Sequence, residues 1–341
     1  MKHRPGIVLA AIAVVGALTM SACAGGSSDV PGGRDTADGS AGTLNLYAYA
    51  VPKPGFDKII PAFNSTDEGD GVAINPSFGA SGDQSRKVAA GAPTDIVNFS
   101  LTPDVTRLVD AGLVDPDWDQ DAYQGIPYGS VVTIVVREGN PLGIEDWDDL
   151  LQPGLEVITP NPFSSGSAKW NLLAPYAAKS NGGQNPQAGL DYVSTLINEH
   201  VRLQPKSGRE ATEAFLQGAG DVLLSYENEA LFIQSHGEPV EHVTPAQTFR
   251  VDNPVAVLST SQNPEKANAF RDFLYSKPGQ RIWAEAGFGP VDPAVAAEFE
   301  YKFPAPEKLW TIDDLGGWST VDPELFAQGT GSIAVIYDAA N

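Results

Sequence analysis

The sequence predicts an α/β protein of two lobes, and three observations lead to this prediction. From Thr43 onward, short apolar or β-branched segments alternate with segments of helical spacing, which indicates α/β units with mostly parallel sheet. Two longer β-branched runs, at residues 127–137 and 248–258, lie on either side of a self-contained α/β unit. The 341 residues, 42% of them hydrophobic, are enough for two lobes with proper cores.

The expected elements follow one another along the chain. We expect strands at residues 44–49, 72–76, 95–98, 131–137, 156–159, 221–226 and 248–258. We expect helices at residues 56–63, 84–90, 103–111, 168–178, 186–199, 265–275 and 279–286, with another beginning near Glu210. A chain that crosses to a second lobe and returns would show this order. We therefore assign residues 43–128 and 250–341 to one lobe and residues 129–249 to the other.

The beginning of the chain predicts export. A basic start, Lys2-His-Arg4, precedes an apolar run at residues 7–18 that is short for a membrane span. This pattern indicates a secretory signal over residues 1–22. The small residues of Met20-Ser-Ala-Cys23 resemble a bacterial lipobox, in which the cysteine is lipidated. The alternative is an ordinary signal that is cleaved nearby, with Cys23 incidental.

Residues 23–42 predict a tether. After the cysteine they are rich in Gly, Ser and Asp, with one Val and no aromatic residue. Such a segment cannot bury enough apolar surface to fold. We therefore expect an extracytoplasmic domain, held in the cell envelope by a lipid anchor on Cys23.

The charge and the cysteine count exclude several functions. The chain has 21 Lys and Arg against 43 Asp and Glu, a net charge of -22, which repels nucleic acid and anionic lipid headgroups. With one cysteine there is no intrachain disulfide and no cysteine-based metal site. If such a protein binds an anion, it must do so through local dipoles and hydrogen bonds in a dry, closed cleft.

Four loops of small residues point to such a cleft. They follow strand candidates or precede helix candidates, at Tyr49-Ala50, Phe78 to Asp83, Ser164 to Ser167 and Ser207-Gly208. Ligands of open α/β sheets collect beyond the carboxyl ends of strands. Serines at helix starts leave free N–H groups at the positive end of the helix dipole, which favours anions. Most single Ser-Gly stretches are only caps and turns, so the hypothesis depends on their repetition.

Signals for catalysis are weak. Gly79-Ala-Ser81-Gly82 is not a G-x-S-x-G elbow, and no S-x-x-K pair occurs. The histidines beyond the signal, His200, His236 and His242, lack a zinc spacing. We expect no catalytic residue, metal or cofactor.

Four separated segments together resemble a known family. They are Thr159 to Asn171, Gly220 to Ala230, Val136 to Pro141 with Asp146 to Leu150, and Leu309 to Trp318. In this order they are similar to segments of the sulfate-binding proteins of bacterial sulfate/thiosulfate ABC importers. The likeness runs from about residue 44 to beyond residue 318.

The resemblance implies a periplasmic-binding-protein fold of type II, with two α/β lobes, a hinge and a ligand cleft between them. The family holds sulfate without a metal, using backbone N–H groups, one serine hydroxyl and one tryptophan indole. The partners it implies are the oxyanion and the membrane permease of an ABC importer, with the binding protein a monomer. Carried over by motif, the ligand-binding residues are Tyr49 or Ala50, Ser81, Ser165, Gly166, Ser167, Gly208 and Tyr226.

Three departures from the family bear on selectivity. Ser167 replaces a glycine, Asp83 replaces a lysine, and Tyr226 replaces the ligand tryptophan. Unlike an indole, a tyrosine hydroxyl can accept as well as donate. A site of donors alone suits fully deprotonated sulfate, whereas protonated phosphate needs an acceptor. Molybdate, tungstate, thiosulfate and phosphate therefore remain alternatives.

Two hypotheses of other classes remain open. One is an extracytoplasmic hydrolase of sulfate or phosphate esters, although the expected metal ligands and the nucleophile with its base are missing. The other is an envelope interaction protein with a degenerate cleft.

Overall fold

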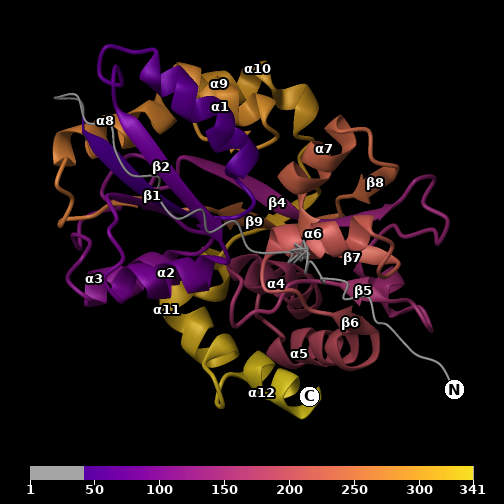
Figure 1. Ribbon diagram of the computed structural model, residues 1–341. Helices are drawn as coiled ribbons and strands as arrows, with labels where there is room; N and C mark the ends of the chain where they lie inside the picture. Colours follow the sequence, from indigo (N-terminus) through magenta and orange to yellow (C-terminus); the bar gives the residue numbers. More distant parts are fainter. Residues whose placement is uncertain (1–41, 341) are drawn as a thin grey trace, which may run out of the picture.

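A computed structural model describes residues 42–340, which form two sheets with helices around them (Figure 1). The first sheet has the strand order β10-β3-β1-β2, and the second has the order β12-β9-β4-β7-β5-β6, with β8 and β11 also paired to β4. The predicted signal, Cys23 and all but the last residue of the predicted tether lie outside the described residues.

The first sheet has helices on both faces. Its strands are β1 (Thr43–Tyr49), β2 (Ala73–Gly79), β3 (Ile96–Asn98) and β10 (Val255–Val257). β1 is parallel to both β2 and β3, whereas β10 is antiparallel to β3. One core contains side chains of α1 (Lys53–Asn64), α8 (Pro264–Tyr275) and α9 (Lys277–Glu285), and a second contains those of α2 (Ser81–Ala89) and α3 (Thr102–Asp110). Aromatic rings fill the first of these cores, where Phe56 meets Trp283 edge to face, a favourable geometry.

The second sheet is built around β4 (Tyr128–Arg137), which is antiparallel to β7, β8, β9 and β11. The other strands are β5 (Val157–Ile158), β6 (Val201–Leu203), β7 (Val222–Tyr226), β8 (Val240–Val243), β9 (Gln247–Asp252), β11 (Gly289–Pro290) and β12 (Lys308–Trp310). The prediction of mostly parallel sheet is therefore wrong around β4. The reason is that β4 takes the chain into this sheet and β9 brings it back, so the two run in opposite directions.

The predicted strand at residues 248–258 is two strands. β9 pairs with β4 in the second sheet, and β10 pairs with β3 in the first. Asn253 and Pro254 separate them. Proline has no N–H to donate to a sheet, so it ends the ladder. At this break the chain passes from one sheet to the other.

The remaining α-helices are α4 (Gly166–Ser180), α5 (Pro186–Thr195), α6 (Gly208–Leu216), α7 (Glu227–Ser235), α10 (Pro293–Glu298), α11 (Trp318–Val321) and α12 (Ser332–Ala340). α4, α6 and α7 pack against strands of the second sheet, whereas α10 packs on α9 and β11. The predicted helix at 186–199 is α-helical to Thr195 and continues as a π-helical turn, Leu196–His200. α12 packs against α5 and this turn, as the yellow helix near the C-terminus of Figure 1 shows. β12 likewise lies beside β9.

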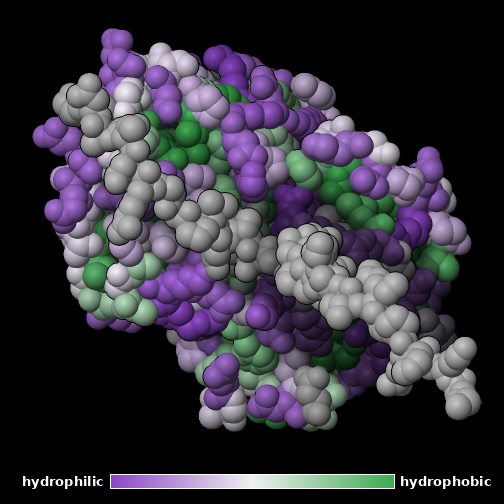
Figure 2. Space-filling model, in the orientation of Figure 1, coloured by the Kyte–Doolittle hydropathy of each residue, from purple (hydrophilic) through white to green (hydrophobic). Residues whose placement is uncertain are grey.

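One face of the molecule is mainly hydrophilic. Hydrophilic side chains cover most of the face seen in Figure 2, and apolar groups form small patches between them. Among residues 42–340, no helix has the length and apolar character needed to cross a membrane.

Candidate functional site

A small cavity lies where loops of the two sheets meet. It encloses about 10 Å³. The loops come from the ends of β1, β2, β3 and β5 and from the turn before α6. The lining residues are Tyr49, Ala50, Val51, Gly79, Ala80, Ser81, Ser100, Ser165, Gly166, Ser167, Ser207 and Gly208.

The structure brings the predicted site residues together. All of them except Tyr226 line this cavity. Tyr226 lies directly behind the lining, where its hydroxyl is 2.8 Å from Ser100 Oγ. Strand ends that are distant in the sequence thus converge, as the rule for open α/β sheets predicts.

Three helices begin at the cavity. Ser81 is the first residue of α2, Gly166 of α4 and Gly208 of α6. The N–H groups of a first helical turn have no intrahelical acceptor, and the dipole of each helix places positive charge at this end. The arrangement therefore offers several donors and a positive potential without a cationic side chain.

Ser165 and Ser207 precede helices but use their hydroxyls differently. Ser207 caps α6, because its Oγ accepts from the N–H of Glu210 at 3.2 Å. Ser165 precedes α4 but makes no side-chain cap. Its Oγ lies instead 2.7 Å from Ser167 Oγ. The Ser165 hydroxyl thus belongs to the cavity, whereas that of Ser207 belongs to the helix.

The Ser81 hydroxyl is already committed. It donates to Asp104 Oδ2 at 2.6 Å and accepts from the N–H of Ser100 at 2.9 Å. Arg107 holds Asp104 through an ion pair of 2.9 Å. Only the backbone amide of Ser81 is therefore left for a ligand.

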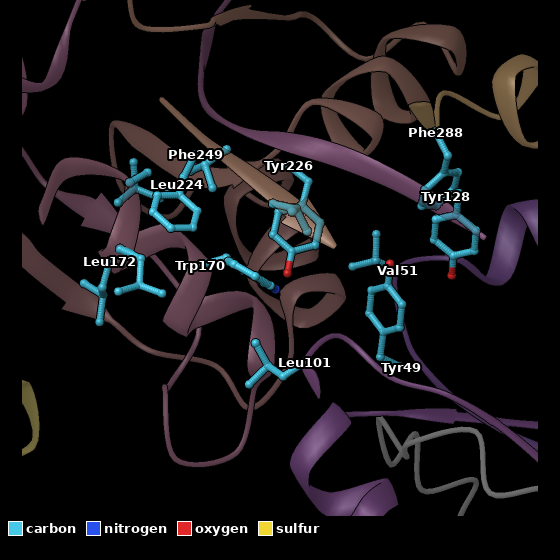
Figure 3. Close-up of a cluster of buried hydrophobic side chains, with 14 of the residues drawn as sticks. Tyr49, Val51, Leu101, Tyr128, Trp170, Leu172, Leu224, Tyr226, Phe249 and Phe288 are labelled. Carbon is cyan, nitrogen blue, oxygen red and sulfur yellow. The ribbon is translucent and has the colours of Figure 1, made fainter. Parts of the chain in front are cut away.

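Tyr226 is a neutral hydroxyl in a dry setting. It ends β7 and is 1% exposed. Burial raises its pKa well above the usual value, although hydrogen bonds to Ser100 and Ser167 act in the opposite direction. Figure 3 shows its hydroxyl near the indole of Trp170 and opposite Val51. At neutral pH this side chain keeps its proton and is able to donate it.

A second buried tyrosine lies at the end of β1. Burial raises the pKa of Tyr49 well above its ordinary value, and the neighbouring Tyr128 raises it further. Tyr128 itself donates to Asn98 Oδ1. These phenols stay uncharged near the cavity, so they do not repel an anion.

Comparisons with known proteins show which family the chain belongs to. The family model of the bacterial extracellular solute-binding proteins matches residues 44–289. The chain belongs to this family. A sulfate-binding protein of Synechococcus elongatus is 36% identical over 94% of this chain and 93% of its own length. A sulfate-binding protein of Escherichia coli is 37% identical over 80% of this chain and 86% of its own.

A solved structure is more similar still. The sulfate-binding protein SubI from Mycobacterium tuberculosis H37Rv is 64% identical, with a TM-score of 0.83, over 84% of this chain and 99% of that chain. The predicted periplasmic-binding-protein fold is thereby confirmed, as is the resemblance that the four segments indicated.

In this solute-binding protein, glycine is needed where the loops approach. A Cβ on Gly166 would lie 2.7 Å from Leu101 Cγ and 2.8 Å from Ser100 Cβ. A Cβ on Gly208 would lie 2.9 Å from Ser167 Oγ and 3.2 Å from Val51 Cγ2. Any larger side chain would push the segments apart.

Ser100 is the main residue that the sequence analysis missed. It is 1% exposed, and it lines the cavity between β3 and α3. Its position after a strand and before a helix is the signal that identified the other loops. Asn98-Phe-Ser-Leu101 contains no glycine and only one serine, so it lacks the small-residue pattern of the other loops.

Asp83 and the histidines do not reach the cavity. The carboxylate of Asp83, the residue that replaces the family's lysine, is 41% exposed and pairs with Arg86. His200 is buried elsewhere, with Nδ1 3.0 Å from the carbonyl oxygen of Leu155. Across residues 42–340 no group of three or more His, Cys, Asp or Glu side chains is arranged to hold a metal ion.

Proposed function

We propose that the protein binds extracytoplasmic sulfate and delivers it to the permease of an ABC importer. One observation carries the proposal: a buried cavity is lined by three helix starts and by serine hydroxyls, and no charged side chain is in its lining. Such a site provides donors without a carboxylate acceptor. Sulfate is fully deprotonated at neutral pH and needs only donors.

Each predicted residue has a proposed role. The amides of Ser81, Gly166, Ser167 and Gly208 would donate to the oxyanion, with that of Tyr49 or Ala50 at the end of β1. Ser165 would donate its hydroxyl. Tyr226 would supply the aromatic donor. The names of the sulfate-binding relatives support sulfate as the ligand.

Calorimetric titration tests the ligand. Protein beginning near residue 43 would be titrated with sulfate, thiosulfate, molybdate, tungstate and phosphate. We expect sulfate to bind most tightly, because the lining offers backbone N–H groups and hydroxyls but no carboxylate to accept the proton of hydrogen phosphate. Phosphate binding tenfold tighter than sulfate, about 1.4 kcal/mol, would contradict the proposal. Preference for thiosulfate, molybdate or tungstate would keep the oxyanion site but change its cargo.

We propose further that the protein is a binding protein and not an enzyme. Its relatives are named as solute-binding proteins. The cavity lining contains no histidine, cysteine or carboxylate to serve as a base. Turnover of aryl sulfates or aryl phosphates by the pure protein would show the opposite.

The anchor and the lobe limits also remain proposals. We propose that a lipid on Cys23 holds a monomer in the cell envelope. The sequence predicts lobes at residues 43–128 with 250–341 and at 129–249. We propose the same division except that residues 308–341 belong to the second lobe, because β12 pairs with β9 and α12 packs on α5.

A further inference from the structure

Ser100 is fixed in place by its backbone. Its N–H donates to Ser81 Oγ at 2.9 Å. Its carbonyl oxygen accepts from Trp170 Nε1 at 2.7 Å and from Asn253 Nδ2 at 3.3 Å. These partners belong to α2, to α4 and to the passage between β9 and β10. Because the residue is buried and its backbone is held on both sides, its hydroxyl has little freedom to leave the cavity.

The Ser100 hydroxyl begins a line of hydroxyls. Its Oγ is 2.8 Å from Tyr226 Oη. The Ser167 side chain also acts on Tyr226, whose pKa it lowers, and Ser167 Oγ is 2.7 Å from Ser165 Oγ. The line runs from the segment after β3, through the end of β7, to the start of α4.

Proton counting constrains this line. Each hydroxyl has one proton, and at every contact between two hydroxyls one of them must donate its proton to the other. Tyr226 can direct its proton toward Ser167 or an anion only if Ser100 supplies the proton for the 2.8 Å contact. If the hydrogen bond has the opposite direction, Tyr226 gives its proton to Ser100, and the Tyr226 oxygen faces the cavity as an acceptor.

We propose that Ser100 is a specificity-determining residue of the oxyanion site and acts through Tyr226. By donating to Tyr226, Ser100 occupies an acceptor position of the phenol and leaves the phenol proton for the anion side. A tryptophan indole needs no such partner, because it can only donate. Ser100 thus makes a tyrosine behave as a one-way donor. The inference rests on the proposed function, because it assumes that the oxyanion lies in this cavity.

This role predicts an effect on selectivity. In Ser100→Ala, the Tyr226 oxygen regains a free acceptor position that suits the proton of hydrogen phosphate. Sulfate, which has no proton to give, loses an oriented donor. We expect sulfate affinity to fall about tenfold, in the range for the loss of one hydrogen bond between neutral groups, while phosphate affinity stays the same or rises.

The test is a double-mutant cycle on the full chain in detergent, with sulfate and phosphate as calorimetric probes. Ser100→Ala, Tyr226→Phe and the double variant would be compared with the parent protein. Ser180→Ala serves as the matched control, since Ser180 is a fully buried serine at the far end of α4. If Ser100 acts through Tyr226, its substitution has no further effect on sulfate affinity once Tyr226 is phenylalanine.

Two results would overturn the inference. An unchanged effect of Ser100→Ala in the Tyr226→Phe background would show that Ser100 does not act through Tyr226. Equal losses for sulfate and phosphate would show a purely structural role. Ser165→Ala separates these failures from failure of the proposed function. If Ser165→Ala leaves sulfate affinity unchanged, the site itself is wrong. If it weakens sulfate binding while the cycle shows no coupling, only the inference about Ser100 is wrong.

Discussion

At the scale of single residues, Gly166 sets how closely two segments approach. A methyl group there would lie within 2.9 Å of side-chain atoms of Leu101 and Ser100, closer than atoms in van der Waals contact. We expect Gly166→Ala to weaken sulfate binding tenfold or more, about 1.4 kcal/mol, because the start of α4 must move away from the cavity. Calorimetric titration would measure the change.

Gly289→Ala is the control for this substitution. A Cβ on Gly289 would have its nearest neighbour, the carbonyl oxygen of Gly129, at an ordinary 3.5 Å. The residue lies in β11, away from the cavity lining. We expect this variant to bind sulfate like the parent. Equal losses in both alanine variants would argue against a steric role for Gly166.

Ser165 and Ser207 permit a paired prediction, because only one of them caps a helix. Ser165→Ala should weaken sulfate binding strongly and leave the unfolding free energy nearly unchanged, because Ser165 makes no side-chain cap. Ser207→Ala should lower the unfolding free energy by about 1 kcal/mol, the usual cost of a lost cap. Urea unfolding and calorimetric titration of both variants would separate the two roles. A stability loss in Ser165→Ala as large as that in Ser207→Ala would contradict the assignment.

At the scale of elements, α7 begins with a buried carboxyl group. Glu227 is 4% exposed, and burial raises its pKa from 4.5 to about 7. The unfolded chain therefore loses this proton at lower pH than the folded protein does. Stability should fall as pH rises from about 4.5 to about 7, by an amount on the order of 3 kcal/mol for this group alone.

Glu227→Gln should remove this dependence, because glutamine carries no ionisable proton. We expect the free energy of unfolding of the variant, minus that of the parent, to be larger at pH 8 than at pH 5. Urea unfolding at the two pH values would measure this difference. Glu298→Gln is the control, since Glu298 is an exposed carboxylate paired with Arg281. If the difference between Glu227→Gln and the parent is the same at both pH values, the carboxyl group is not buried in the way described.

The sequence predicts the start or end of an element only where residues close to it in the sequence determine it. The start of α4 follows from Ser165 and Gly166, because capping chemistry is local. The start of α7 does not, because Tyr226 passes directly from a strand into a helix without a turn residue. The break at Pro254 separates strands of two sheets, and only the tertiary structure reveals which strands pair.

The residues of the site also divide into those that the local sequence predicts and those that only the tertiary structure reveals. Motifs place Ser165 and Tyr226, and the structure confirms that both lie at one cavity or directly behind it. The part played by Ser100 depends on contacts with Ser81 and Trp170, which are distant in the sequence. The side chain of Asp83 points out to Arg86, and no local pattern shows this direction.

At the scale of the whole molecule, the charge of -22 opposes the arrival of an anion. A groove of about 980 Å³ adjoins the cavity and shares Ala50, Gly79 and Ser207 with it. Its charged lining is balanced, with Lys53, Lys58, Arg209 and Lys302 against Asp57, Glu210, Glu213 and Glu285. The approach path therefore has no net basic charge to offset the field of the molecule.

This balance predicts how salt affects binding. Sodium chloride screens long-range repulsion over a Debye length of about 10 Å at 0.1 M, so the association rate of sulfate should rise severalfold between about 10 mM and 200 mM salt. The dissociation rate should stay nearly constant, because salt screens interactions within a buried cavity much less than those between exposed charges. Stopped-flow fluorescence would follow both rates, with sucrose at equal osmolality as the control for effects unrelated to charge. A fall of the association rate with salt would instead indicate that Lys53, Lys58, Arg209 and Lys302 attract the anion despite the charge of the whole protein.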